Sequence, residues 1–419
     1  RRTPRSTLFP YTTLFRISKE RAFSPAYEYG NPTLDNNMKW KVTLSDLNFD
    51  GREQKAVERV FKSRWLTMGE TVERLESDFS DFIGVKYAIA VSSGTAALHL
   101  AMRALEIKAG DEVIVPSLSF VASSNAILYV GAKPVFVDIA GWDDFNLSFH
   151  DLKRKITSKT RAVVVVHYGG YMANMRQIKK VAKEHRLFII EDAAHAIGAK
   201  LNSKMAGTWG DLGCFSFFSN KNLATGEGGM IVTQNRRLAE KLRLLRSHGM
   251  TSTTLSRHKG HAYSYDVMDL GYNYRMTEMA AALGILQLRK LPDANKKRRV
   301  LTELYMTKLK DVDGLSIPFR DYPRPSSYHL FPILLNRIVN REKFMELLKN
   351  ERIQSSIHYP PIHTFSYYRG ILGPKETKLP STEYVGAHEV TLPLHPRLTK
   401  EDVTLVCDKI KNILPRSLR

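Results

Sequence analysis

Between residues 87 and 233 the chain contains seven short apolar segments separated by polar or helical stretches. None of the seven alternates cleanly between apolar and polar side chains, so each is expected to be buried on both faces. Such strands are typical of a mainly parallel sheet covered by helices. The expected strands are Tyr87–Val91, Glu112–Val115, Pro134–Val137, Ala162–Val166, Leu187–Ile190, Phe215–Phe218 and Met230–Thr233.

Apolar side chains at helical spacing lie before and between these strands. Gly51–Phe82 has this spacing in two parts, which are separated by a turn at Trp65–Gly69. Further helices are expected at Thr95–Leu105, Ala122–Tyr129, Met175–Glu184 and Arg236–Arg246. Strands that alternate with helices predict an α/β fold with a doubly wound sheet, which we place in a large domain, residues 20–280.

The remainder, residues 281–419, is predicted to be a smaller α+β domain. Its first helix, Glu278–Leu291, is expected to stop at Pro292, and a second helix is expected at Ala294–Lys310. Shorter elements follow at Tyr328–Leu335, Arg341–Lys349 and Glu401–Ile413. Residues 1–19 carry five basic residues and no acidic one. Because they look like the translation of a sequencing adapter, we treat them as a non-native or disordered leader.

Composition narrows the classes of protein. The 419 residues are 43% hydrophobic and 25% charged, which is ordinary for a globular chain long enough for two domains. No apolar run reaches the roughly 18–20 residues of a membrane helix, so no membrane partner is expected. The only cysteines, Cys214 and Cys407, cannot form a disulfide framework or a four-cysteine metal site. A cytoplasmic protein without a metal is therefore expected.

The net charge of +21 raises the possibility of nucleic-acid binding. The basic residues are thinly spread, however, and the densest clusters, Lys296–Arg299 and Arg236–Arg237, form no long tract. A moderate basic field suits anionic small substrates such as nucleotides equally well. We expect no nucleic-acid partner.

Four segments at predicted strand ends carry candidate chemistry. In Cys214–Met230 a strand breaks into a polar turn that displays Lys221 and then resumes after glycines; the alternative is a hairpin with a solvated lysine. Ser92, Ser93 and Gly94 lead into a helix that opens at Thr95. That arrangement suits a phosphate group, although simple N-capping would explain the same residues.

A carboxylate and an aromatic ring complete the set. Asp192 follows a hydrophobic strand and needs a cationic partner if it is buried, either a structural salt bridge or a ligand. His195, three residues on, could equally be a core histidine. Phe120 ends the loop Pro116–Phe120 and either stacks on a planar ring or packs in the core. A phosphate site, an acid, a stacking ring and a lysine are together what pyridoxal 5′-phosphate requires.

The sequence resembles the DegT/DnrJ/StrS-type sugar aminotransferases, pyridoxal-phosphate enzymes of fold type I. The resemblance extends from about Trp65 to the C-terminus. It is carried by six motifs in a characteristic order and spacing: Ser93–Leu98, Glu191–Ala194, Phe215–Phe217 followed by Lys221, Gly226–Gly229, Leu270–Met276 and Leu392–Pro396.

The resemblance implies roles for residues around the cofactor ring. Lys221 matches the lysine that forms a Schiff base with the cofactor and moves protons in catalysis. Asp192 matches the partner of the pyridine nitrogen, and Phe120 the aromatic ring that stacks on the cofactor. His195 matches a position beside the cofactor's 3-hydroxyl that is often glutamine in the family.

The resemblance also implies roles around the cofactor phosphate. Gly94, Thr95 and Ser216 match phosphate ligands. Asn273 matches a residue that reaches the phosphate of the neighbouring subunit's cofactor, which implies a homodimer with shared active sites. The acceptor pocket is expected near the Trp65–Gly69 turn and the loops at His329 and Tyr359.

The implied reaction moves an amino group from glutamate to a keto group of a nucleotide-linked sugar, in biosynthesis of amino sugars for a surface polysaccharide or a secondary metabolite. A cyclitol ketone is the alternative acceptor, and a non-catalytic regulatory protein that binds the cofactor is the alternative function. A branch of the family that removes a hydroxyl group carries histidine in place of the lysine, and Lys221 argues against it.

Overall fold

The computed structural model of the protein describes residues 39–252, 260, 264–321, 326–372 and 378–419. The predicted leader, residues 1–19, lies outside the described residues. Residues 40–419 form one compact unit. None of the described helices combines the length and the apolar character that crossing a membrane requires.

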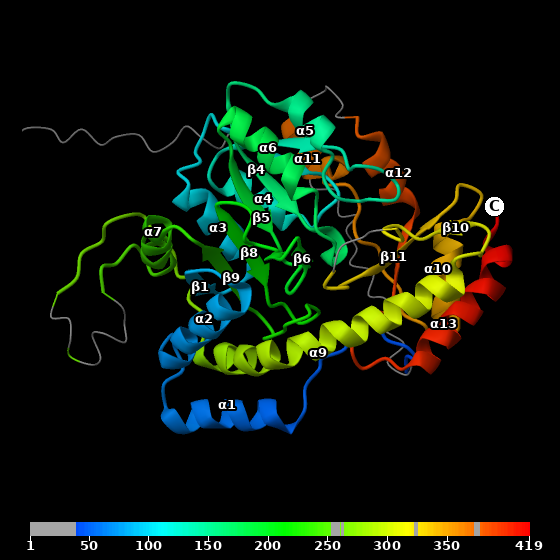
Figure 1. Ribbon diagram of the computed structural model, residues 1–419, viewed down its shortest axis with the longest axis horizontal. Coiled ribbons are helices and arrows are strands. Elements are labelled where there is room, and N and C mark those ends of the chain that lie inside the picture. The colour runs from blue at the N-terminus through cyan, green and yellow to red at the C-terminus, as the bar shows by residue number, and fades with distance from the viewer. Residues whose placement is uncertain (1–38, 253–259, 261–263, 322–325, 373–377) are drawn as a thin grey trace, which may run out of the picture. The chain divides into compact units, whose positions relative to one another are not determined.

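A seven-stranded sheet forms the centre of this unit (Figure 1). Its strand order is β1-β9-β8-β5-β4-β2-β3, and only β9 runs antiparallel to its neighbours. The strands are β1 (Tyr87–Val91), β2 (Glu112–Pro116), β3 (Lys133–Val137), β4 (Thr160–Val166), β5 (Phe188–Asp192), β8 (Leu212–Ser216) and β9 (Gly229–Thr233). The predicted α/β fold with a mainly parallel, helix-covered sheet is confirmed.

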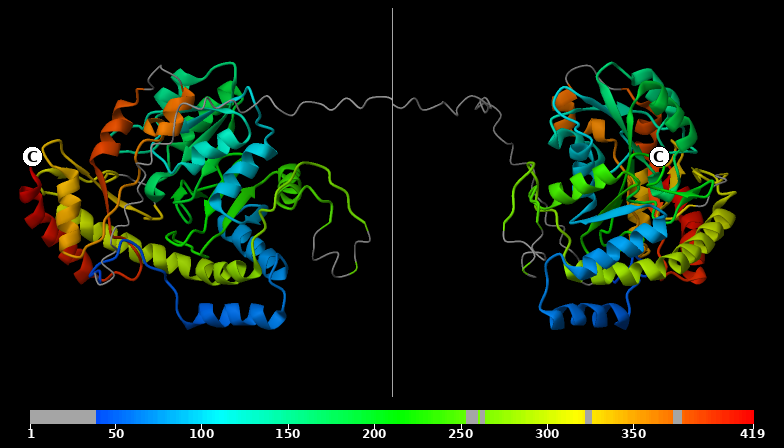
Figure 2. Two further views of the ribbon diagram at one scale, coloured as in Figure 1. Left: turned by 180° about the vertical axis from the view of Figure 1, so that it is seen from behind. Right: turned by 60° about the vertical axis from the view of Figure 1, so that its left-hand side comes forward.

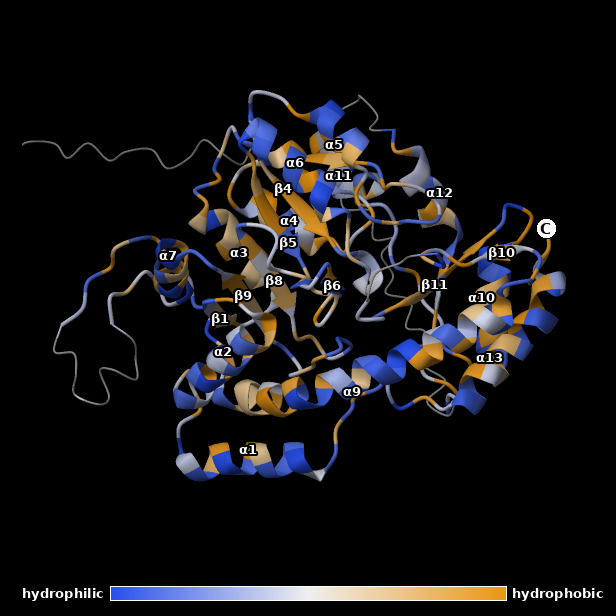
Figure 3. Ribbon diagram, viewed as in Figure 1, coloured by the Kyte–Doolittle hydropathy of each residue, from blue (hydrophilic) through white to orange (hydrophobic). Residues whose placement is uncertain are grey.

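Both faces of the sheet are covered, which explains why the strands lack polar alternation. In β1, Ala88 and Ala90 pack into one core while Ile89 and Val91 pack into the other. The first core includes α2 (Glu70–Ile83), α5 (Phe149–Lys155), α6 (Met175–His185) and the start of α9 (Glu278–Leu309). The second includes α3 (Gly94–Ala104), α4 (Ala122–Tyr129), α7 (Arg236–Arg246) and α11 (Ser366–Leu372). Figure 3 shows the apolar strands inside helices with polar faces.

A smaller three-stranded sheet lies near the end of α9 and has its own core. It consists of β10 (Leu315–Ser316), β11 (Phe331–Leu335) and β12 (Glu389–Leu392), with α10 (Arg341–Asn350) and α13 (Lys400–Ile413) beside it (Figure 1). Other described elements are α1 (Gly51–Ser63), β6 (Lys200–Leu201), β7 (Lys204–Met205), α12 (Pro380–His388) and the short helices η1 (Tyr168–Gly170), η2 (Ile362–Thr364) and η3 (Leu414–Ser417).

Helix α9 corrects the prediction that a helix stops at Pro292. The helix is continuous from Glu278 to Leu309 and passes through Pro292. Its start packs in the first core of the large sheet and its end in the core of the small sheet, and both views of Figure 2 show it as one long helix. Proline removes one backbone hydrogen bond from a helix, but buried Leu291 and Ala294 pack on either side of it. Packing therefore outweighs the local break. The division at residues 280 and 281 falls in the first turn of this helix and stays a prediction.

The strand that precedes Lys221 also differs from its prediction. Strand β8 ends at Ser216, so Phe217 and Phe218 lie in the following loop rather than in the strand. Phe217 remains fully buried, whereas Phe218 is exposed. Aromatic residues favour strands but also anchor loops in a core, and the sequence pattern could not separate the two.

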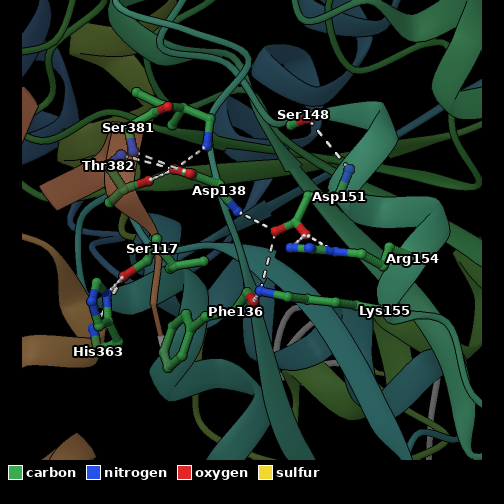
Figure 4. Close-up of polar contacts among 12 residues, drawn as sticks. Ser117, Phe136, Asp138, Ser148, Asp151, Arg154, Lys155, His363, Ser381 and Thr382 are labelled. Carbon is green, nitrogen blue, oxygen red and sulfur yellow. Dashed lines mark hydrogen bonds and ion pairs between the residues drawn. The ribbon is translucent and has the colours of Figure 1, made fainter. Parts of the chain in front are cut away.

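A polar network joins the C-terminal segment to the large sheet (Figure 4). Asp138 follows β3 and accepts hydrogen bonds from the backbone N–H groups of Ser381 and Thr382, at 3.1 and 2.8 Å, in the first turn of α12. Asp151 in turn accepts from the backbone N–H of Asp138 at 2.8 Å and pairs with Lys155 at 3.1 Å. Carboxylates at a helix N-terminus are favourable because of the unpaired N–H groups there. The start of α12 is thereby fixed to the large sheet.

Candidate functional site

The carboxyl ends of β1, β2, β5 and β8 meet at one edge of the large sheet, and a cavity of about 530 Å³ opens there. Seven of the eight predicted site residues line it: Gly94, Thr95, Phe120, Asp192, His195, Ser216 and Lys221. They come from four separate segments, at the ends of these four strands, and the sheet topology brings them together. The eighth, Asn273, does not line the cavity.

The loop that carries Lys221 is closed by backbone hydrogen bonds. The N–H of Phe217 donates to the carbonyl of Gly228 at 2.9 Å, and the N–H of Thr225 donates to the carbonyl of Phe217 at 2.8 Å. A Cβ on Gly228 would lie 2.6 Å from Thr225 Oγ1, so only glycine fits this close approach. The loop therefore holds Lys221 in a fixed position at the cavity wall.

The cavity changes the ionisation of Lys221. Burial disfavours the charged amine and lowers the pKa of Lys221 to about 8, against the opposing effect of the negative charge on Asp192. A larger fraction of the amine is therefore neutral at physiological pH than for a solvated lysine. A neutral amine is the form that attacks a carbonyl carbon.

Asp192 is the last residue of β5 and is buried. Its Oδ2 accepts a 2.6 Å hydrogen bond from Ser123, which contacts Ser119 at 2.9 Å, and its Oδ1 accepts from the backbone N–H of Ala194 at 3.2 Å. Burial nevertheless raises the pKa of Asp192, despite these bonds and the charge of Lys221. A cation bound in the cavity would reverse that shift, as a protonated pyridine nitrogen does.

The end of the cavity where a phosphate site is predicted is formed by tight packing of α3 on β8. A Cβ on Gly94 would lie 2.8 Å from Cβ of Ser216, so glycine lets the helix N-terminus reach the end of the strand. Ser93 caps α3 by accepting from the N–H of Ala96 at 3.0 Å, which leaves Thr95 at the cavity wall. Oδ1 of Asn220, also at the wall, is buried and has no hydrogen-bond partner among the described residues. It is available to a ligand.

His195 is held in one tautomer by its neighbours. The backbone N–H of Gly169 donates to Nδ1 of His195 at 3.3 Å, so Nδ1 carries no proton. Burial lowers the pKa of His195 well below its ordinary value, which keeps the ring neutral with its proton on Nε2. Nε2–H therefore donates a hydrogen bond to the Tyr359 hydroxyl oxygen, 3.0 Å away, and the hydroxyl can donate a hydrogen bond into the cavity.

Sequence reasoning missed several residues of the cavity. Ser123 and Asn220 were not singled out, nor were Glu227 and His358, although all but Ser123 line the wall. Tyr359 was expected near the acceptor pocket, and it does line the cavity. For Ser123 a signal existed, because Ser119 and Ser123 are spaced by four residues beside the predicted stacking ring Phe120. Glu227 lies within the recognised motif Gly226–Gly229, whereas His358 is distant in sequence from every recognised motif, and only the fold brings it to the cavity.

The residues expected near the acceptor pocket differ in their positions relative to this cavity, within the described part of the chain. Trp65–Gly69 does not line the cavity; Met68 and Gly69 line a different one of about 450 Å³. His329 lies behind the wall, with its ring centroid 4.4 Å from that of His195. Phe120 is 57% exposed and faces the cavity beside Tyr359, with ring centroids 6.0 Å apart. An exposed aromatic face of this kind is available for stacking on a planar ring.

The donor set fits pyridoxal 5′-phosphate. A glycine-lined helix N-terminus suits the phosphate, buried Asp192 suits a protonated ring nitrogen, exposed Phe120 suits a planar ring, and Lys221 suits the aldehyde. Among the described residues, no group of histidine, cysteine, aspartate and glutamate side chains is arranged to hold a metal ion.

Comparison with known proteins agrees with this geometry. Residues 48–411 match the profile of the DegT/DnrJ/EryC1/StrS aminotransferase family. The spore coat polysaccharide biosynthesis protein SpsC of Bacillus subtilis is 38% identical over 370 residues, which are 87% of this chain and 95% of that protein. GDP-perosamine synthase of Vibrio cholerae is 37% identical over 374 residues, 88% of this chain and 98% of that protein. The structure of the putative sugar aminotransferase Spr1654 of Streptococcus pneumoniae, in its PMP form, superposes with a TM-score of 0.84 at 27% identity and covers 90% or more of each chain.

Proposed function

We propose that this chain, which belongs to the DegT/DnrJ/EryC1/StrS aminotransferase family, is a pyridoxal-phosphate enzyme that transfers an amino group from glutamate to a keto group of a nucleotide-linked sugar. The observation that carries the proposal is one cavity that holds both the amine of Lys221 and the carboxylate of Asp192. Pyridoxal 5′-phosphate, when bound, supplies the aldehyde that carries the amino group and a ring that stabilises negative charge at the reacting carbon.

Each side chain has a task in this proposal. Asp192, oriented by Ser123, keeps the ring nitrogen protonated. Gly94, Thr95 and Ser216 bind the phosphate at the N-terminus of α3. The amine of Lys221 attaches the cofactor and then carries protons at the reacting carbon, for which a pKa of about 8 suits neutral pH.

The nucleotide-linked sugar is supported by chemistry and by relatives. The chain is basic, with a net charge of +21, and even a moderate field of this sign attracts a diphosphate. One relative is named GDP-perosamine synthase, a name that refers to a nucleotide-linked sugar. Another is named as a spore coat polysaccharide biosynthesis protein. The product would then be an amino sugar for a surface polysaccharide or a secondary metabolite.

A homodimer with shared sites is part of the proposal. Among the described residues of the cavity wall, Lys221 is the only lysine and no arginine is present, although glutamate and a diphosphate both carry two negative charges. Residues 264–274 expose several apolar side chains by more than half, namely Tyr265, Val267, Met268 and Leu270. A second subunit that covers this segment would bring Asn273 toward the neighbouring cavity.

The direct test combines purified protein, pyridoxal 5′-phosphate and glutamate with a panel of nucleotide-linked keto-sugars. We expect the bound cofactor to absorb in the visible range, glutamate to bleach it, and one keto-sugar to be aminated. Cyclitol ketones in the same panel test the alternative acceptor. A protein that stays colourless, or that aminates nothing, would contradict the proposal.

Lys221→Ala is the matching variant. We expect transamination to fall by more than about a thousand-fold, since the variant lacks both the amine that attaches the cofactor and the group that moves the proton. Lys159→Ala, a substitution on the surface away from the cavity, is the control and should retain wild-type activity. Full turnover by Lys221→Ala would remove the lysine from the mechanism.

A further inference from the structure

A chain of hydrogen bonds leads from the cavity wall to a carboxyl group in the interior. His358 lines the cavity, and its Nδ1 lies 2.9 Å from Oγ1 of Thr391 on β12. The Thr391 hydroxyl in turn makes a short hydrogen bond to Oε1 of Glu389. Thr391 and Glu389 are buried, at 1% and 0% exposure, and neither lines the cavity. Of these three hydrogen-bonded residues, only His358 can contact a ligand in this cavity.

The backbone of His358 is fixed on both sides. Its N–H donates to Oε2 of Glu389 at 2.8 Å, and its carbonyl accepts a short hydrogen bond from the Tyr168 hydroxyl. Glu389 begins β12 directly after α12, whose start is held by Asp138 on the large sheet. The imidazole therefore has a defined orientation, with Nδ1 engaged and Nε2 without a hydrogen-bond partner among the described residues.

We propose that Glu389, Thr391 and His358 form a proton relay in which His358 Nε2 gives a proton to, or takes one from, the keto oxygen of the acceptor. This inference rests on the proposed function. Replacing a ketone by an amine expels the oxygen as water, and the departing oxygen needs a proton donor. Lys221 acts at the carbon, so a group on another wall of the cavity is needed at the oxygen.

The direction of the hydrogen bonds depends on the proton of Glu389. When Glu389 is ionised, Thr391 donates to it and accepts from Nδ1–H of His358, which leaves Nε2 as a base. When Glu389 is protonated, it donates to Thr391, Thr391 donates to Nδ1, and Nε2–H becomes a donor to the cavity. The imidazole is neutral in both arrangements.

Donation moves one proton without charging the imidazole. The Nε2–H bond of His358 breaks as the proton joins the departing oxygen. The Thr391 O–H breaks as Nδ1–H forms, and the Glu389 O–H breaks as Thr391 regains its proton. Glu389 ends ionised and His358 ends in its other tautomer. The reverse sequence takes a proton from the cavity and returns it to Glu389.

The surroundings tune the carboxyl group to this task. Burial raises the pKa of Glu389 to about 8, against the opposing effects of the Thr391 and His358 hydrogen bonds and the charge of Arg341 on α10. Tyr168 and Tyr359, which lie near Glu389, have pKa values raised by burial and stay neutral. His195 and His329, which lie near His358, have pKa values lowered by burial and stay neutral too. Burial, with a smaller effect of the Lys221 charge, lowers the pKa of His358 to about 4. Near neutral pH the proton is therefore stored on Glu389 and not on His358.

The hydrogen-bond coupling between Glu389 and Thr391 can be tested without cofactor or substrate. Infrared difference spectra of the full-length cofactor-free protein should show a protonated carboxyl band that titrates near pH 8 and is missing in Glu389→Gln. Thr391→Val removes a hydrogen bond that lowers the pKa of Glu389, so the midpoint should rise. Thr391→Ser keeps the hydroxyl and should leave it unchanged. A midpoint that is the same in Thr391→Val and Thr391→Ser would overturn the relay.

The catalytic part is tested by single-turnover amination of the keto-sugar from the pyridoxamine form. We expect Thr391→Val to slow this step by about 100-fold with little change in substrate affinity, and Thr391→Ser to stay near the wild type. The wild-type rate should fall above about pH 8, as Glu389 loses its proton.

Glu389→Gln gives the sharpest outcome. The amide oxygen of Gln would accept from the N–H of His358, and its NH₂ group would face Thr391, so the variant keeps the hydrogen bonds of protonated glutamate but has no proton to give. Because an amide cannot release a proton to Thr391, single-turnover amination should fall about as far as in Thr391→Val and lose its decline at high pH, and a wild-type rate in this variant would contradict the relay. A decline that remains unchanged in this variant would refute the relay. If the wild-type protein aminates no keto-sugar, the proposed function fails, and the infrared midpoints still decide whether the three residues are coupled.

Discussion

Ser123 is the residue through which helix α4 acts on Asp192. Its hydroxyl donates a 2.6 Å hydrogen bond to Oδ2 and opposes the effect of burial on the pKa of this carboxyl. In Ser123→Ala the pKa of Asp192 rises further, so Asp192 pairs less well with a protonated ring nitrogen. Since a hydrogen bond to a charged group contributes about 1.5–3 kcal/mol, we expect pyridoxal 5′-phosphate to bind at least about tenfold more weakly.

Two comparisons isolate this effect in equilibrium binding measurements. Ser124→Ala alters the next residue of α4, which makes no hydrogen bond to Asp192 and should change affinity little. A cofactor analogue with carbon in place of the ring nitrogen should bind the Ser123→Ala variant and the wild type equally. Equal loss of affinity for both cofactors would show that Ser123 acts only on packing.

The ionisation of Lys221 predicts the pH dependence of cofactor attachment. Burial lowers its pKa to about 8, so the reactive neutral amine forms as the pH rises through 8. The rate at which cofactor-free protein captures pyridoxal 5′-phosphate should therefore rise with pH and level off above about 8. Because the charge of Asp192 raises the pKa of Lys221, Asp192→Asn should move the midpoint downward. Stopped-flow absorbance measures both curves, and a midpoint near 10.5 would show a solvated lysine.

At the scale of single residues, the sequence predicted the residues that line the cavity more fully than the residues that hydrogen-bond to them from behind. The sequence neighbours of a residue at or just after a strand end indicate its chemistry, as they do for Lys221, Asp192 and Gly94. The partners Ser123 and His358 were not predicted, because serine and histidine are common in loops and helices. Ser123 gains its role where α4 meets β5, and His358 gains its role where the segment before η2 meets β12.

At the scale of elements, the N-terminus of α3 is the feature that suits a phosphate. Gly94 lets this helix approach Ser216 so closely that a Cβ would lie only 2.8 Å from Cβ of Ser216. Gly94→Ala should push the helix off the strand and weaken binding of pyridoxal 5′-phosphate by about tenfold or more, while binding of pyridoxal, which has no phosphate, changes little. Fluorescence titration with both ligands measures the contrast.

Gly51→Ala is the matched control for this prediction. Gly51 is likewise the first residue of a helix, α1, but nothing lies within 4 Å of the position its Cβ would take. This variant should bind both ligands like the wild type and be as stable or slightly more stable. If Gly94→Ala weakens pyridoxal and pyridoxal 5′-phosphate equally, the loss is structural and the phosphate assignment is wrong.

The elements themselves were predicted closely where burial and propensity agree, and less well where they compete. Strand β1 and helix α7 have their predicted bounds because each carries an uninterrupted pattern between turn residues. Helix α9 was divided wrongly at Pro292, and β8 was placed too late, because tertiary packing overrides a local signal in both. Helix α5 (Phe149–Lys155) was not predicted at all, because it spans only seven residues, five of which are charged or histidine. So few apolar positions give no clear helical period.

At the scale of the whole molecule, the site depends on segments far apart in the chain. The wall of the cavity that contains His358 and Tyr359 comes from the C-terminal part, and Asp138 fixes α12 of that part to the large sheet. The relay residues Glu389 and Thr391 follow α12 directly. Assembly of the site is thus coupled to packing of the C-terminal segment, which composition and periodicity do not reveal.

The proposed dimer leads to a prediction about mixed subunits. If Asn273 acts at the neighbouring subunit's cofactor, a dimer of one Lys221→Ala and one Asn273→Ala subunit contains one site with both residues intact. We expect each homodimer to have little activity and the mixed dimer, co-expressed with two tags and purified by both, to recover about half of the wild-type rate.

The control uses two residues that line the same cavity of one subunit. A mixed dimer of Lys221→Ala and Asp192→Asn has a defect in each of its sites, because both side chains belong to the same wall. It should therefore stay as inactive as its parents. Recovery in the Asn273 pair and not in the Asp192 pair requires that Asn273 acts across the interface, because a residue that serves its own subunit leaves no complete site in either mixture. Equal inactivity of the two mixtures would confine Asn273 to its own subunit, and the exposed apolar segment 264–274 would then need another explanation.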